Sequence, residues 1–206
     1  MKKNGWITQF LTNHDSARPV SWFGNDRELR YETATMLALL THTHPGTVYI
    51  YQGEEIGMVN YPFRSVKDFN DLESINAYNE LTEKMGWEPG EIFPKIANKS
   101  RDNARTPMQW DDSPNAGFTT GKPWLAVNPN YKKINAQEQI GRSDSVFHYY
   151  RKLIELRHQY GIIVYGHYDL QLAEDPDLYV YTRELDVKAA TSSTGSFRRM
   201  KRTSFM

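Results

Sequence analysis

Apolar and polar positions follow a strand, helix, strand order at the start of the chain. Residues 6–11 form a short apolar run that ends in polar residues, which predicts a buried strand. Apolar residues then recur at helical spacing from Asp26, a potential helix cap, to about residue 43, and Pro45-Gly46 stops this pattern. Residues 47–51 are apolar and rich in β-formers. This βαβ order predicts an α/β fold with neighbouring parallel strands.

The predicted helix offers a definite apolar face and a basic end. Its apolar face is expected to comprise Leu29, Met36, Leu37 and Leu40. His42 and His44 lie near its C-terminal end, where they are expected to act as a charge or cap rather than as ligands.

The stretch 52–142 is long and irregular. Helical segments are predicted at about residues 71–85 and 88–98, and frequent Pro and Gly exclude long elements after them. An excursion of this length is unusual in a compact domain and is most often functional.

The last third of the chain is predicted to pass from a helix to strands and then to a disordered segment. Ser145 is expected to cap a helix that runs to about Tyr160, and strands are predicted at 162–165 and 178–181 around a polar turn. A β domain is therefore expected to begin after this helix. Residues 187–206 are small, hydroxylated and basic without strand alternation, and are expected to be disordered.

Composition narrows the function classes. The 25 basic and 25 acidic residues cancel, so no charge excess indicates nucleic acid or an anionic membrane as a partner. Cys is absent, which excludes disulfides and a thiol nucleophile. No apolar stretch approaches the length of a membrane span or signal peptide, so a cytoplasmic location is expected. Aromatic residues make up 13% of the chain, which is compatible with sugar stacking.

Polar clusters follow both predicted strands. Asn13-His14-Asp15 comes after the first, and Gln52-Gly53-Glu54-Glu55 comes after the second. Ligands of parallel α/β folds gather at the carboxyl ends of strands. Such triplets are also common turn makers, and Glu54 and Glu55 are expected to pair with loop backbone or arginines. No His and carboxylate spacing fits a metal site, so neither metal nor cofactor is predicted.

Four segments together resemble one enzyme family. Residues 10–18, Phe-Leu-Thr-Asn-His-Asp-Ser-Ala-Arg, resemble the fourth conserved region of the α-amylase family, glycoside hydrolase family 13. Residues 49–58, Tyr-Ile-Tyr-Gln-Gly-Glu-Glu-Ile-Gly-Met, resemble its eighth barrel strand and the following loop. Residues 101–111 and 115–121 are similar to its oligo-1,6-glucosidase and dextran glucosidase branch. The resemblance covers about residues 6–186.

This resemblance implies the C-terminal part of a (β/α)8 TIM barrel, about strands 7 and 8 with their helices, over residues 1–160. The excursion 52–142 belongs to this part. Residues 161–186 would begin a C-terminal β-sandwich domain, and residues 187–206 diverge from the family.

The resemblance also implies a mechanism. Family members are retaining glycosidases, in which a carboxylate nucleophile and a carboxylic acid lie about 5–5.5 Å apart. A third carboxylate binds sugar hydroxyls and stabilises the transition state. Asp15 matches that third carboxylate, His14 would donate to hydroxyls of the same glucose, and Asn13 would brace the loop.

Other residues receive roles from the same comparison. Arg101 matches the branch's arginine that holds the non-reducing glucose, paired with an Asp from an early barrel loop, which makes the enzyme exo-acting. Glu73 would line the next subsite. Arg18 is expected either to contact substrate or to form a structural ion pair, while Arg105 and Trp110 are expected to pack loops.

The motifs for the nucleophile and the acid/base do not occur in this sequence. We therefore expect a C-terminal fragment of an α-glucosidase acting on α-1,6-linked isomalto-oligosaccharides, inactive alone and completed by an N-terminal half-barrel. The alternatives are a transglycosylase or isomerase, a trehalose-6-phosphate hydrolase, or a non-catalytic carbohydrate-binding remnant. Half a barrel exposes sheet edges and apolar surface, which predicts poor solubility without its complement.

Overall fold

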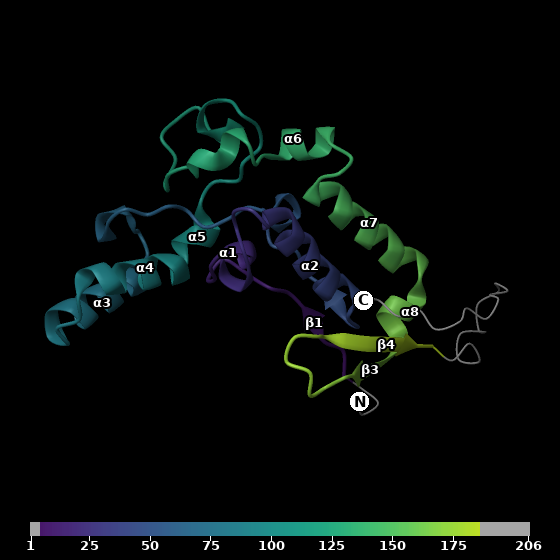
Figure 1. Cartoon of the computed structure of the whole chain (residues 1–206). Coiled ribbons are helices and arrows are strands. Elements are labelled where there is room, and N and C mark those ends of the chain that lie inside the picture. Colours follow the sequence, from purple (N-terminus) through teal and green to yellow (C-terminus); the bar gives the residue numbers. More distant parts are fainter. Residues whose placement is uncertain (1–4, 186–206) are drawn as a thin grey trace.

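The computed structural model describes residues 5–185 (Figure 1). The tail predicted for residues 187–206 lies outside this range. Strand β1 (Thr8–Gln9) pairs in parallel with β2 (Thr47–Val48), with Thr8 opposite Thr47, which confirms the predicted βαβ order. Both strands are shorter than the apolar runs that predicted them, because neither has a second neighbour within the described residues.

Two helices connect β1 to β2. Helix α1 (Pro19–Phe23) was not predicted, and Pro19 occupies its first turn, where a missing N–H costs nothing. Helix α2 (Arg30–Thr43) begins four residues after the expected cap. Asp26 instead accepts a hydrogen bond from the hydroxyl of Ser21, at 2.6 Å. The predicted start at Asp26 is therefore wrong, although the helix is present.

The buried face of α2 differs from the predicted one. Leu37 is buried, but Leu29 and Met36 are more than half exposed. Small residues such as Ala34 and Ala38 form the packed face instead. Their size allows helix α7 (Val146–Gln159) to lie close against α2, as Figure 1 shows.

Helix α7 begins at the predicted cap, because Ser145 accepts a hydrogen bond from the backbone N–H of His148. Its apolar face closes the main core with α1 and α2. The buried members of this core are Val20, Ala34, Ala38, Val59, Val146, Tyr150 and Leu153.

His42 lies inside this packed region rather than acting as a charged end of α2. Its Nδ1 lies 2.8 Å from the carbonyl oxygen of Ala38, and its ring meets Tyr150 edge-on. Burial lowers the pKa of His42. Of the expected charge or cap, the structure supports the cap, because Nδ1 of His44 likewise lies 2.5 Å from the carbonyl oxygen of Leu40. Nε2 of His44 reaches the hydroxyl of Tyr179 at 2.9 Å.

The excursion between β2 and α7 contains the predicted helices and several short ones. Helix α3 (Leu72–Asn79), which continues into a π turn (Glu80–Lys84), and α4 (Pro89–Lys99) confirm the segments predicted near 71–85 and 88–98. The shorter helices are α5 (Asp102–Arg105), α6 (Ala136–Gly141) and 3-10 turns at Glu54–Ile56, Val66–Asp68, Pro114–Gly117 and Pro129–Lys132. A second small core of Ile56, Met58, Met108 and Ala136 ties the excursion to the loop after β2.

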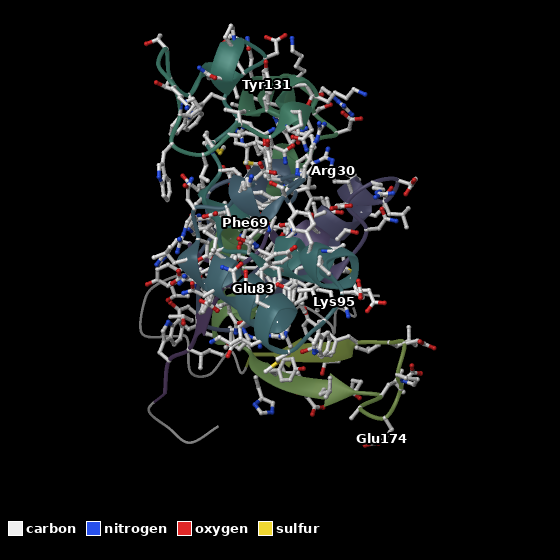
Figure 2. All side chains as sticks on the ribbon, turned by 90° about the vertical axis from the view of Figure 1, so that its left-hand side faces the viewer. Arg30, Phe69, Glu83, Lys95, Tyr131 and Glu174 are labelled. Atoms are coloured by element: carbon white, nitrogen blue, oxygen red, sulfur yellow. The ribbon has the colours of Figure 1, made fainter. Side chains whose placement is uncertain are left out.

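The chain ends in a helix and a hairpin. Residues predicted as a strand at 162–165 form helix α8 (Gly161–Tyr165), so that prediction is wrong. Strands β3 (His167–Gln171) and β4 (Val180–Glu184) are antiparallel, and β4 overlaps the strand predicted at 178–181. Figure 2 shows Glu174 at the turn of this hairpin, at the opposite end of the molecule from Tyr131 in the excursion.

Candidate functional site

The loop after β1 is held in a tight turn by Asn13. Its side-chain oxygen accepts a hydrogen bond from the backbone N–H of Asp15, at 2.8 Å, and one from the hydroxyl of Ser16, at 3.1 Å. This self-contained turn leaves the side chains of His14 and Asp15 exposed. Asn13 therefore supports the loop and does not itself face solvent with a free oxygen.

The carboxylate of Asp15 lies between His14 and two arginines. One oxygen is 3.1 Å from Nε2 of His14. The other is 2.7 Å from a guanidinium nitrogen of Arg105 and 3.7 Å from one of Arg101. About half of the Asp15 side chain (47%) remains exposed, so a ligand can still reach it.

Arg101 is held by a buried partner. Its Nε and Nη2 donate to one oxygen of Asp71, at 3.0 and 2.5 Å, and Nη2 lies 3.5 Å from Glu73. Burial on its own would raise the pKa of Asp71, but hydrogen bonds from Arg101, Ser74 and the backbone of Glu73 outweigh it and lower that pKa to about 2. Asp71 therefore stays ionised and fixes the direction of Arg101.

The backbone around Asp71 is held in place by Asp102, the residue after Arg101. One oxygen of buried Asp102 accepts hydrogen bonds from the backbone N–H groups of Asn70, at 2.7 Å, and of Asp71, at 2.9 Å. Sequence reasoning missed Asp71, because its position before α3 reads as a helix cap, which it also is. The resemblance placed the partner of Arg101 in an early barrel loop, whereas this partner lies 30 residues before it.

Arg105 was expected to pack loops, and the structure corrects this. Its Nη2 contacts Asp15, and its Nε donates to the backbone carbonyl of His14 at 2.9 Å. The spacing from Arg101 could have indicated this, because residues four apart share one helix face.

Arg18 is fully buried, with 1% of its surface exposed. Its guanidinium donates to the carbonyl oxygens of Gln52, Asn103 and Ala104 and to the hydroxyl of Thr106. Burial lowers the pKa of Arg18 to about 10. These contacts join the loop after β1 to the loop after β2 and to helix α5, so the geometry favours the structural alternative, with carbonyls in place of a carboxylate.

The loop after β2 is packed tightly against Arg18. Gly53 has a φ of 94°, and a Cβ there would lie 2.7 Å from Nη1 of Arg18. Glu55 accepts from the backbone N–H of Gly53 at 2.8 Å, as expected for a structural residue. Glu54 is buried and accepts a hydrogen bond from Thr12, and burial raises the pKa of Glu54 to about 7.

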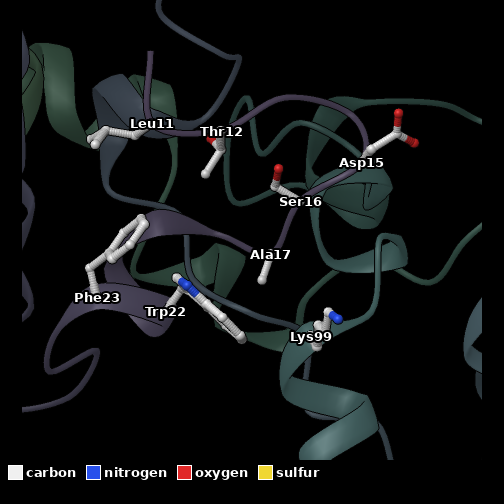
Figure 3. Close-up of a pocket in the computed structure, with 8 residues that line it drawn as sticks. All are labelled: Leu11, Thr12, Asp15, Ser16, Ala17, Trp22, Phe23 and Lys99. Atoms are coloured by element: carbon white, nitrogen blue, oxygen red, sulfur yellow. The ribbon is translucent and has the colours of Figure 1, made fainter. Parts of the chain in front are cut away.

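A hollow of about 250 Å³ adjoins the loop on its other side (Figure 3). Figure 3 shows the rings of Trp22 and Phe23 and the side chain of Lys99 around it, with Asp15 at the rim and pointing away. The lining residues are Leu11, Thr12, Asp15, Ser16, Ala17, Trp22, Phe23 and Lys99.

Two further features concern residues 5–185 only. In that range, no three His, Asp or Glu side chains gather in a way that could hold a metal ion. None of the helices there is long and apolar enough to cross a membrane.

The site is thus a half-exposed array of carboxylates and guanidiniums at the carboxyl end of a parallel strand. Such an array offers several charged donors and acceptors to one ligand, which suits a polyhydroxylated molecule. Residues 1–166 match the family model described as "Alpha amylase, catalytic domain". The chain belongs to the α-amylase family.

Curated relatives of the chain include an oligo-1,6-glucosidase and a trehalose-6-phosphate hydrolase. The chain is 56% identical over 185 residues to the oligo-1,6-glucosidase of Parageobacillus thermoglucosidasius, covering 90% of the chain and 33% of that protein. It is 45% identical over 179 residues to the trehalose-6-phosphate hydrolase of Bacillus subtilis, covering 87% of the chain and 32% of that protein. The chain therefore spans about a third of the length of the curated relatives it matches.

Solved structures agree with this family. A trehalulose synthase, MutB, superposes with a TM-score of 0.86 at 48% identity, covering 90% of this chain and 34% of that one. The trehalose-6-phosphate hydrolase of Bacillus licheniformis gives a TM-score of 0.84 at 47% identity, covering 88% of this chain and 33% of that one. These likenesses support the TIM-barrel fold of α-amylase-family glycoside hydrolases.

Proposed function

We propose that this chain supplies the sugar-binding third carboxylate of a retaining, exo-acting α-glucosidase that acts on α-1,6-linked isomalto-oligosaccharides. In this proposal β1 and β2 are strands 7 and 8 of the barrel, and the β3–β4 hairpin begins the C-terminal β-sandwich. The observation that carries the proposal is the convergence of Asp15, His14 and Arg101 at the carboxyl end of β1.

Each residue has a distinct task at the sugar. Asp15 accepts hydrogen bonds from two hydroxyls of the glucose and offers negative charge to the oxocarbenium-like transition state. His14 donates to a neighbouring hydroxyl. Arg101 binds the non-reducing end, and its fixed pairing with Asp71 closes that end of the pocket. Glu73, whose carboxylate lies 3.5 Å from Arg101, lines the next subsite on the leaving-group side of the glucose.

The substrate linkage follows from the relatives. The oligo-1,6-glucosidases of Parageobacillus thermoglucosidasius and Bacillus cereus are 56% and 50% identical to the chain, which favours α-1,6 linkages. Sucrose isomerisation is the second candidate, because trehalulose synthase structures superpose closely and one of them holds isomaltulose. Product profiles on isomaltose, sucrose and trehalose 6-phosphate, measured on the chain combined with an N-terminal half-barrel, separate these reactions.

The chain requires two more carboxylates for turnover, and we propose that a complementary N-terminal half-barrel supplies them. The chain alone is then expected to bind glucose or isomaltose without releasing glucose, since loss of the nucleophile removes orders of magnitude of rate. Calorimetry on the chain and on Asp15→Ala tests the binding, which the substitution should abolish. Glucose release from isomaltose at ordinary enzyme rates by the chain alone would refute the need for a complement.

A further inference from the structure

We propose that Arg105 is a positioning residue, which holds the carboxylate of Asp15 in the orientation that receives the sugar. This inference rests on the proposed function of Asp15. It gives a role to a residue that the sequence motif alone left as loop packing.

Arg105 grips the loop after β1 at two points. Its Nη2 donates to Oδ1 of Asp15 at 2.7 Å, and its Nε donates to the carbonyl oxygen of His14 at 2.9 Å. The two contacts fix the carboxylate relative to its own backbone, which a single contact would not do. Only 24% of the Arg105 side chain is exposed, against 47% for Asp15. Solvent therefore screens the contact between Arg105 and Asp15 only in part, while the exposed part of Asp15 stays open to a ligand.

Among the described residues, neither Arg101 nor His14 can take over this task. Arg101 lies 3.7 Å from Asp15 but only 2.5 Å from Asp71, so it is committed to its buried partner. His14 contacts the opposite carboxylate oxygen, yet its own side chain is 70% exposed. Without Arg105, the carboxylate would be free to turn toward Arg101 and compete with Asp71.

The support beneath Arg105 is rigid. It lies at the end of α5, where the backbone N–H of Thr106 donates to the carbonyl of Asp102 at 3.1 Å. The neighbouring carbonyls of Asn103 and Ala104 are bound by buried Arg18. Arg18 therefore fixes the segment that presents Arg105, and Arg105 fixes Asp15.

The grip requires a guanidinium rather than any positive charge. Arginine presents several donors in a planar fork, whereas lysine offers one compact ammonium on a flexible stem. A lysine at 105 would keep the attraction to Asp15 but could not hold the carboxylate and the His14 carbonyl together. The two variants Arg105→Lys and Arg105→Gln therefore separate charge from geometry.

The test measures binding of isomaltose and of 1-deoxynojirimycin, a cationic analogue of glucose, to the 206-residue chain by calorimetry. Arg105→Gln should weaken both by about tenfold or more, the loss typical of a hydrogen bond to a charged group. Arg105→Lys should fall between. The carboxyl carbon resonance of Asp15 should move in both variants, while the thermal midpoint should shift no more than in Arg142→Gln, a matched change in an exposed ion-paired arginine.

The outcomes are distinguishable. If the unsubstituted chain binds neither probe, the proposed function fails and this inference fails with it. If it binds both and Arg105→Gln binds equally tightly with an unchanged Asp15 resonance, only the inference is overturned. If Arg105→Gln unfolds, Arg105→Lys decides, and wild-type affinity in that variant overturns the inference.

Discussion

At the scale of single residues, the site is a chain of ion pairs between carboxylates and arginines. Asp71 holds Arg101, Arg101 and Arg105 both face Asp15, and Arg105 returns to the loop of His14. Each member is paired on at least one side, so removing one leaves a neighbour uncompensated. The most buried member, Asp71, is therefore expected to matter most for stability.

The substitution Asp71→Asn should lower the free energy of unfolding by an amount that depends on pH. The pKa of Asp71 falls from 3.8 to about 2 in the folded chain, so its stabilisation is present above about pH 4 and disappears as the pH falls through 2. The variant should lose roughly 2 kcal/mol of unfolding free energy at neutral pH. Urea unfolding at low micromolar concentration, at about pH 7 and again near pH 2, measures the difference.

A matched control is Asp144→Asn. Asp144 is also paired with an arginine, Arg142, but both side chains are largely exposed. Solvent screens such pairs, so the control should change stability far less than Asp71→Asn. Equal losses in the two variants, or a loss for Asp71→Asn that persists unchanged near pH 2, would contradict the role given to Asp71.

The pKa of Glu54 is shifted upward, in the opposite direction to that of Asp71, so its effect on stability has the opposite pH dependence. Burial is the main cause that raises the pKa of Glu54 to about 7, against the hydrogen bond from Thr12, which lowers it. Ionising this carboxyl costs stability as the pH rises from 4.5 through 7. Glu54→Gln should therefore be more stable than the unsubstituted chain above about pH 7, by up to roughly 3 kcal/mol, and should lose that advantage below about pH 4.5.

The same urea series at several pH values checks the Glu54 prediction. Glu28→Gln serves as its control, because it makes the same substitution at an exposed glutamate. A Glu54→Gln chain that is less stable than the unsubstituted one at pH 8 would contradict this prediction. It would mean that the hydrogen bond from Thr12 to the ionised carboxylate stabilises the fold more than burial of the charge destabilises it.

At the scale of elements, periodicity and capping residues predicted the long helices and failed where tertiary contacts decide. α7 begins at Ser145 as predicted, because a cap is a local feature. α8 replaced a predicted strand because Arg183, twenty residues later, binds the carbonyls of Ile162 and Ile163 at its end. β-branched residues alone could not show that partner.

The site residues also divide into those that local sequence predicted and those that depend on distant contacts. The motif placed His14 and Asp15 correctly at the end of β1, because strand ends are local features of sequence. Asp71 and Arg105 were missed, because their partners lie 30 and 90 residues away along the chain. Arg18 looked like a site residue because its neighbours in sequence are, yet its side chain turns inward.

The packing of α7 on α2 can be tested with adjacent residues. Leu153 is buried in the main core, whereas Ile154 beside it is about one third exposed (36%). Leu153→Ala should cost about 2–5 kcal/mol of unfolding free energy, and Ile154→Ala less than about 1 kcal/mol. Urea titrations of the two variants provide the comparison, and similar costs would contradict the assigned helix face.

At the scale of the whole molecule, the described residues hold two separate two-stranded sheets and many exposed apolar side chains. Five aromatic rings are about half exposed; they are Trp6, Phe10, Trp22, Phe23 and Tyr49. Two strands cannot close a barrel, and open edges with apolar faces favour association.

The chain alone is therefore expected to self-associate and to bind a hydrophobic dye, and a complementary chain should suppress both. The remaining two thirds of the Parageobacillus thermoglucosidasius oligo-1,6-glucosidase is a suitable complement, given its 56% identity over the shared part. Replacing Trp22 and Phe23 with serine should reduce self-association, whereas Trp124→Ser, which removes an even more exposed ring in the excursion, should not. Size-exclusion chromatography with light scattering measures both effects. A monodisperse monomer with a cooperative thermal melt would show that the apolar face needs no partner, because a folded unit that exposes it would then be stable on its own.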